Sequence, residues 1–188
     1  MLLKAVNELL GAEVLACDGE IGELEDFYFD CDSWKASYLL VYAYGARLVV
    51  PTSCIAAAMP ALQRVALSPS YDELCTSAGV WPYEAASRWL QNVRVCSARQ
   101  AAGLLIQAED GPAGRVSDLL IDDETWAIQY IVAATGQGWR SPQVLFPLEW
   151  VAALELRHCR VRVRRSRAEL SAAPRVAAPS PRSRSAKG

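Results

Sequence analysis

Acidic side chains gather at two places in the chain, and carboxylates are the protein groups best suited to hold a hard cation. The two groups are Asp26, Asp30 and Asp32, then Asp118, Asp122, Asp123 and Glu124. Clustered carboxylates can bind Ca²⁺ or Mg²⁺. The spacing lacks the Asp-x-Asp-x-Asp-Gly order of a calcium loop, and aspartate is common at strand ends and tight turns. The pattern therefore favours solvated turns over a metal site.

Nucleophilic catalysis has little support in the sequence. The sole histidine, His158, is adjacent to Cys159, so in a strand the two side chains would point to opposite faces and could not form a nucleophile-base pair. A role for His158 as a pH-sensitive partner contact stays open. The segment Gly136-Gln-Gly138 lacks the lysine and helix start of a phosphate loop. We therefore predict no catalytic residue, no cofactor and no enzyme activity.

The spacing of the cysteines gives no sign of a disulfide framework or a metal site. They are Cys17, Cys31, Cys54, Cys75, Cys96 and Cys159, with no Cys-x-x-Cys pair among them. This spacing predicts neither a disulfide scaffold nor a zinc knuckle. We expect reduced, mostly buried thiols that act as small hydrophobic groups.

Charge is distributed unevenly along the chain. Up to Leu156 there are 9 Lys and Arg against 20 Asp and Glu, whereas residues 157–188 hold 10 Lys and Arg against Glu169 alone. Within the basic part, a strand would place Val161 and Val163 on one face and a row of arginines on the other. These arginines are Arg160, Arg162 and Arg164, continued by Arg165 and Arg167. Such a row could bind RNA or an anionic membrane, or it could protect a sheet edge from pairing with other chains.

The elements that must position these groups occur twice. Seven residues recur 92 positions later in the same order. The first set is Asp18, Gly19, Gly22, Asp26, Asp30, Trp34 and Tyr38, and the second is Asp110, Gly111, Gly114, Asp118, Asp122, Trp126 and Tyr130. Turn formers and large aromatics repeat, whereas the acidic Glu20 becomes Pro112. The shape is therefore what the two copies share, and the acidity of the first copy is a surface property and a possible docking face.

Each copy reads as a series of short strands. Asp18-Gly19 predicts a hairpin turn, and Gly22 predicts a bulge or a close backbone approach. Residues 34–44 predict a central strand covered on both faces, and residues 52–58 predict a single helical turn. Ser70 and Glu73 have the spacing of a capping box.

The order of these elements predicts an all-β protein with short helices, built as two small antiparallel β-barrels in tandem. We assign residues 1–78 to the first repeat, 79–97 to an aromatic-rich linker with a short helix, and 98–170 to the second repeat. Residues 171–188 lack large apolar side chains, and they predict a disordered basic tail of Pro, Ser and Arg. Each copy is near the lower size limit for folding alone, so we expect the copies to pack together.

The linker contains the aromatic side chains Trp81, Tyr83 and Trp89. Trp81, Ala85 and Trp89 lie four apart, which places them on one face of a helix if Pro82 occupies its first turn. These aromatics could join the two repeats, or they could form an exposed groove for a partner.

The repeated pattern resembles the PRC-barrel domain, which is named for the cytoplasmic part of the photosynthetic reaction-centre H subunit and also occurs in a ribosome-maturation factor. The resemblance lies in Asp18-Gly through Asp30, Trp34, Tyr38-Leu-Leu-Val and Val49-Val-Pro51, and again from Asp110 to Tyr130. Trp81-Pro-Tyr is similar to bacterial proteins that carry two such barrels. The resemblance implies a non-catalytic module that contacts other macromolecules, with association with a photosynthetic or other membrane complex as a narrower version.

The leading hypothesis is therefore a cytoplasmic adaptor that binds a protein partner or itself, with a homodimer as one form. The alternative is an RNA- or ribosome-associated module that uses the C-terminal arginines. No apolar run is long enough to cross a bilayer, and the first residues do not have the pattern of a secretion signal.

Overall fold

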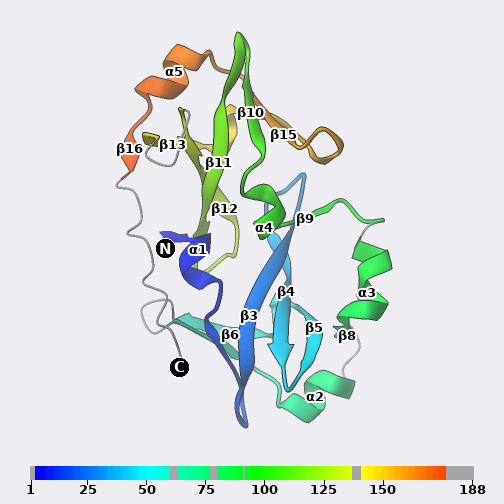
Figure 1. The fold of residues 1–188 in the computed structure, drawn as a ribbon. Helices are drawn as coiled ribbons and strands as arrows, with labels where there is room; N and C mark the ends of the chain where they lie inside the picture. Colours follow the sequence, from blue (N-terminus) through cyan, green and yellow to red (C-terminus); the bar gives the residue numbers. More distant parts are fainter. Residues whose placement is uncertain (1–2, 60–62, 77–79, 91, 137–140, 177–188) are drawn as a thin grey trace, which may run out of the picture.

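The computed structural model describes residues 3–59, 63–76, 80–90, 92–136 and 141–176. Its elements form two sheets, each of eight strands among these residues, with a few short helices. Figure 1 shows the sheet that contains β10 to β13 above the sheet that contains β3 to β5. The prediction of a mainly β fold with short helices is confirmed. Among the described residues, no helix is long and apolar enough to cross a membrane.

The first sheet has the order β6-β7-β2-β3-β4-β5-β8, and β9 also pairs with β3. Its strands are β2 (Glu13–Ala16), β3 (Gly19–Asp30), β4 (Ala36–Ala43), β5 (Ala46–Pro51), β6 (Ile55–Met59), β7 (Arg64–Leu67), β8 (Trp81–Pro82) and β9 (Val95–Ser97). Two helices, α2 (Tyr71–Thr76) and α3 (Tyr83–Leu90), and the 3₁₀ turn η1 (Thr52–Cys54) belong to the same part of the chain.

The second sheet repeats this order as β14-β15-β10-β11-β12-β13-β16, and β1 also pairs with β11. Its strands are β1 (Leu3–Ala5), β10 (Leu105–Ala108), β11 (Gly111–Asp122), β12 (Ile128–Ala134), β13 (Gln143–Pro147), β14 (Val151–Glu155), β15 (Arg160–Val163) and β16 (Arg175–Val176). The helices are α1 (Val6–Leu9), α4 (Ala98–Ala101) and α5 (Arg167–Ala172), and the 3₁₀ turns are η3 (Leu148–Trp150) and η4 (Leu156–His158).

The purely antiparallel pairing that we predicted is wrong in each sheet. The strands β2 and β7 run parallel, as do β10 and β15. Each parallel pair brings the short strand that opens a meander of hairpins beside the strand that closes it. The hairpin at Asp18-Gly19 is confirmed, since β2 and β3 pair antiparallel up to Ala16 and Gly19.

The two repeats exchange their first elements. The strand β1 lies at the start of the first repeat but pairs with β11 of the second, Leu3 opposite Asp122 and Ala5 opposite Leu120. Conversely, β9 precedes the second repeat but pairs with β3 of the first. The sheets therefore cross the sequence boundaries drawn at residues 1–78 and 98–170 at β1 and β9, and the edge strands β8 and β16 also lie outside these ranges.

The exchanged segments join both sheets through one core. A continuous cluster of buried side chains contains Phe27 and Phe29 of the first sheet, Phe146 of the second, and Leu9 of the exchanged helix α1. Burial of a large apolar side chain contributes about 1.5–3 kcal/mol relative to its exposure. The expectation that the copies pack together is confirmed by this shared core.

The repeated glycines mark close backbone approaches. Gly22 and Gly114 have positive φ angles of 155° and 138°, and a Cβ at either position would collide with a backbone carbonyl, that of Tyr42 or of Ala134. The ladder between β2 and β3 also shifts register beside Gly22. The predicted bulge and close approach at Gly22 are both present.

Three local predictions need correction. The strand expected over residues 34–44 begins at Ala36, because Trp34 has a left-handed φ of 57°. The helical turn expected over residues 52–58 ends at Cys54, where β6 follows. Residues 171–176 belong to the end of α5 and to β16, which pairs with the edge of β13. Residues 177–188 of the predicted tail lie outside the described residues.

Candidate interaction surfaces

The repeated aspartates hold the backbone. Asp26 is buried, and its carboxylate accepts hydrogen bonds from the Phe27 N–H (2.8 Å), the Ser97 hydroxyl and the Arg99 N–H (3.2 Å). Asp118 accepts the equivalent bonds from the Leu119 N–H (2.8 Å) and the Asn7 N–H (3.2 Å). Each aspartate therefore fastens the first turn of the helix that arrives with the exchanged strand. Burial raises the pKa of both carboxyl groups.

Asp30 and Asp122 shape the turns after the long strands. Asp30 Oδ1 accepts bonds from the Ser33 N–H (2.7 Å) and the Asp32 N–H (3.1 Å). These bonds lower the pKa of Asp30, and Asp122 has a lowered pKa for the same reason. The tight turn folds Trp34 back so that its ring stacks on Phe29, with centroids 5.3 Å apart. Within the described ranges, no group of three or more His, Cys, Asp or Glu side chains could hold a metal ion.

Asp18 and Asp110 also serve helix ends. Asp18 accepts a hydrogen bond from the Tyr71 N–H at the start of α2, and Asp110 accepts one from the Arg167 N–H at the start of α5. The predicted capping box is confirmed: Glu73 accepts from the Ser70 N–H (2.8 Å), and Ser70 Oγ accepts from the Glu73 N–H (3.2 Å). The hydrogen bonds that these acidic residues accept thus explain why the same turns and helix starts occur in both repeats.

Exposed aromatic side chains are the most unusual feature of the surface. Trp81 and Trp89 are each 38% exposed, and their ring centroids lie 5.6 Å apart. Tyr38 packs against both, edge-on to Trp89 at 5.1 Å and tilted toward Trp81 at 6.4 Å. Exposed tryptophan is costly in water, and aromatic residues are enriched where proteins bind one another.

The position of the helix α3 explains the exposure. Ala86 and Leu90 of α3 are buried against Leu40 and Val49, on the outer face of β4 and β5. Figure 1 shows α3 beside β5 and β8, on the outside of the lower sheet. The residues Trp81 and Pro82 form β8, paired with Val49 and Leu48, so the helix begins only at Tyr83. Our placement of Trp81 on the helix, with Pro82 in its first turn, is therefore wrong.

The side chains of Trp81 and Trp89, together with two small side chains of α3, form a pocket that we call the aromatic slot. The slot is a pocket of about 330 Å³ lined by Trp81, Ala85, Ala86 and Trp89. Tyr83 is not part of this lining. Its side chain is hydrogen bonded to Tyr28, and the pKa of Tyr28 is raised mainly by burial and also by this hydrogen bond. Because α3 packs on the first sheet, the tryptophans cover that sheet, and the geometry favours the predicted groove over contacts that join the repeats.

The arginine row points outward as predicted, but most of its charge is paired. Val161 and Val163 are buried, whereas the side chains of Arg160 and Arg162 contact the carboxylate of Glu155 at 2.6 Å and 3.1 Å. His158 Nδ1 lies 3.4 Å from the same carboxylate. The hydrogen bond from Arg160, and the charges around it, lower the pKa of Glu155. Opposite charge across the β14–β15 hairpin therefore neutralises much of the row.

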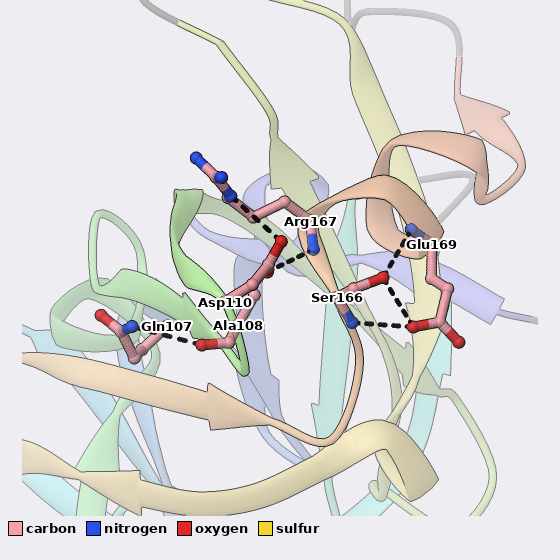
Figure 2. Close-up of polar contacts among 6 residues, drawn as sticks. All are labelled: Gln107, Ala108, Asp110, Ser166, Arg167 and Glu169. Atoms are coloured by element: carbon pink, nitrogen blue, oxygen red, sulfur yellow. Dashed lines mark hydrogen bonds and ion pairs between the residues drawn. The ribbon is translucent and has the colours of Figure 1, made fainter.

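The remaining members of the row serve the local fold. Arg167 lies 3.4 Å from Asp110, as Figure 2 shows beside the capping box of Ser166 and Glu169. Arg165 lies 3.8 Å from Glu169, and its guanidinium lies over the Trp150 ring, 5.0 Å from the centroid. Arg164 is exposed and forms no ion pair with another described residue.

A wide cleft lies between α3 and the segment of the second repeat where β14 leads into η4. It encloses about 940 Å³, and its lining includes Tyr28, Leu90, Arg94, Arg157 and His158. Sequence reasoning missed this cleft because its walls come from distant parts of both repeats. His158 ends η4 and Cys159 follows with a left-handed φ of 49°, so our placement of this pair in a strand is wrong.

The cysteines are free, but our expectation of mostly buried thiols is wrong. Only Cys31 and Cys96 are buried, whereas Cys17, Cys75 and Cys159 are exposed and Cys54 is half-buried. Burial raises the pKa of Cys31 to about 11, so its thiol stays protonated at neutral pH.

Comparison of the chain with protein-family models gives no match, and neither does comparison with curated proteins.

Proposed function

We propose that this protein is a non-catalytic interaction module, built from two PRC-barrel-like repeats, that binds a protein partner through the aromatic slot. The observation that carries the proposal is the pair of exposed tryptophans, Trp81 and Trp89, held 5.6 Å apart around small side chains. Aromatic anchors of this kind supply much of the binding energy in protein interfaces.

The PRC-barrel-like assignment is supported by the repeated roles of matching residues. Gly22 and Gly114 allow the same backbone approach, and Asp26 and Asp118 accept bonds from equivalent exchanged helices. Because the repeated residues support the fold, the slot, whose tryptophans do not recur 92 residues later, is the better candidate for a specific function. The narrower version, association with a photosynthetic or other membrane complex, is tested by the identity of the captured partners.

RNA binding is the alternative, and the ion pairs weaken its support. Phosphate binding depends on unpaired cationic charge, whereas Glu155 already contacts Arg160 and Arg162. RNA binding that weakens steeply with salt, and that falls when residues 160–167 are neutralised, would favour this alternative over the aromatic slot.

The experiment compares native-extract pull-downs by the wild type, by a Trp81→Ala/Trp89→Ala variant and by Tyr44→Ala. Tyr44 is 70% exposed but contacts Tyr71 outside the slot, so it is a matched control for loss of an exposed aromatic ring. We expect protein partners that the wild type and the control retain and that the double variant loses. Identical partner sets for all three proteins would contradict the proposal.

A further inference from the structure

The dimensions of the aromatic slot limit what it can bind. Four side chains line it, those of Trp81, Trp89, Ala85 and Ala86. A helix would need apolar contacts along several turns, whereas a short extended segment can lay one or two rings against the exposed faces of aromatic side chains. Proline-rich segments in the polyproline II conformation are recognised in this way, because they lose little conformational entropy on binding. The slot therefore fits a short proline-containing segment.

The charge of the first repeat selects among such segments. Residues 1–78 contain 11 Asp and Glu against 4 Lys and Arg, a balance of −7. At the slot itself, the exposed Glu84 of α3 is adjacent to Ala85, and the exposed Arg88 lies one turn further along the same helix. The repeat as a whole attracts a basic segment, since complementary charge speeds association and favours the correct partner.

The chain contains a segment of this composition at its own end. Residues 171–188 include Pro174, Pro179 and Pro181, with four Lys and Arg and no Asp or Glu, a balance of +4. The run Pro179-Ser-Pro-Arg182 combines two prolines with an adjacent positive charge. The described part of this stretch ends in β16 at the edge of the second sheet, and Figure 1 shows β16 on the opposite side of the molecule from α3.

The length of chain available decides which copy provides the segment. Pro179 and Pro181 are three and five residues beyond Val176, so they reach at most about 10 and 18 Å from the end of β16. The helix α3 packs against the first sheet, on the outer face of β4 and β5. Because Figure 1 shows β16 and α3 on opposite sides of the molecule, we infer that the slot of a neighbouring copy, and not the copy's own slot, receives the segment.

We propose that the aromatic slot binds the Pro179–Pro181 region of a second copy of this chain, so that the protein associates with itself. The proposal rests on the proposed function and names the partner of the same slot. The contact joins two different surfaces, and it closes into a dimer when each copy binds the other's segment, or extends into longer assemblies when it does not.

The first test titrates the full-length protein with a synthetic peptide of residues 171–188, followed by tryptophan fluorescence. We expect binding that a Pro179→Ala/Pro181→Ala peptide weakens about tenfold, since both rings would lose their aromatic contacts. Trp81→Ala/Trp89→Ala should remove the binding, and Tyr44→Ala should leave it unchanged. Ala85→Lys is a second slot variant, because the exposed Ala85 can be replaced without loss of buried packing, and circular dichroism verifies its fold.

The second test compares sedimentation of the full-length chain with that of a chain ending at Val176. We expect concentration-dependent assembly only for the full-length protein, and loss of assembly in Ala85→Lys. Equal assembly of both chains would overturn the inference, as would peptide binding that ignores the prolines and varies only with salt. If the peptide fails to bind while pull-downs still depend on Trp81 and Trp89, the inference fails and the proposed function stands. If neither depends on the tryptophans, both fail.

Discussion

Lys35 and Ala127 face each other in an isolated antiparallel bridge, and they are the same position in the two repeats, 92 residues apart. The bonds on either side are also equivalent: Ala36 N–H donates to the Trp126 carbonyl (2.7 Å), and Ile128 N–H donates to the Trp34 carbonyl (2.9 Å). A twofold relationship between the repeats therefore passes through this bridge. The exchange of β1 and β9 obeys the same relationship.

The close approach at Gly22 predicts a large loss of stability for Gly22→Ala. The new Cβ would collide with the Tyr42 carbonyl and would also have to adopt a positive φ. Gly19→Ala is a matched control, because Gly19 has a φ of 143° with no atom near the Cβ position. We expect the strain alone to cost about 1–3 kcal/mol at Gly19 and a clearly larger loss at Gly22, measured by urea unfolding. Equal losses would contradict the role of the close approach.

The buried carboxylate of Asp26 predicts different effects for two substitutions. Asp26→Ala leaves the Phe27 N–H, the Arg99 N–H and the Ser97 hydroxyl without their acceptor, which should cost about 1–3 kcal/mol. Asp26→Asn keeps one acceptor oxygen and removes the buried charge, so its cost should be smaller. Free energies of unfolding at neutral pH test this order, and an Asn variant less stable than the Ala variant would disprove it.

The turn aspartates predict how stability depends on pH. Hydrogen bonds lower the pKa of Asp30 below its ordinary value of 3.8, so its contribution is present above that value and is lost as pH falls through the folded-state pKa. Asp30→Asn should therefore flatten the acid side of the stability curve. Asp26 has a raised pKa, so its contribution is largest in acid and is lost as pH rises through that pKa. Asp26→Asn should change the slope of stability against pH in the opposite direction. Free energies of unfolding at a series of pH values distinguish the two variants.

The exchanged strand predicts an effect of one repeat on the other. A chain beginning at residue 10 lacks β1 and α1, which leaves the end of β11 paired with β12 alone and Asp118 without the Asn7 N–H. Amide hydrogen exchange should then accelerate at residues 120–122 of the second sheet, whereas residues 39–41 in β4 should keep their protection. Faster exchange confined to the first sheet would contradict the exchange of strands.

The Glu155 ion pairs predict that this residue controls the charge of the arginine row. Glu155→Gln removes the negative partner of Arg160 and Arg162. We expect affinity for single-stranded RNA to rise relative to the wild type at low salt and the difference to disappear at high salt. Filter binding over a salt series measures both. An unchanged affinity would show that the row does not bind nucleic acid even when it is unpaired.

Local features of the fold could be predicted because short-range sequence determines them. Asp18-Gly19 forms its hairpin, Gly22 its close approach, and Ser70 and Glu73 their capping box, each through contacts within a few residues or one hairpin. The exchange of β1 and β9 could not be predicted, because three-residue strands carry no periodic signal that names a partner more than sixty residues away. The parallel pairs were missed for a similar reason, because each joins four-residue strands that are more than fifty residues apart.

The sequence predicted which residues belong to the candidate sites better than it predicted how those residues are arranged. Trp81 and Trp89 do meet, but they meet because β8 pairs with β5 and delivers Trp81 beside the helix, and four-residue helical spacing is not the cause. The arginines do point outward, yet Glu155, which pairs with them across a hairpin, could not be identified from their alternation. Sequence spacing places side chains on a face, but the partners across that face depend on tertiary contacts.

The reciprocal exchange of first strands also bears on the descent of the protein. A single repeat that lent its first strand and helix to an identical neighbour would be a symmetric homodimer with the same contacts. Duplication and fusion of such a gene would produce the present chain, with the old subunit boundary preserved inside one polypeptide. Trp81 and Trp89 do not recur 92 residues later, where Ala173 and Pro181 stand, so the aromatic slot belongs to one half of the chain alone.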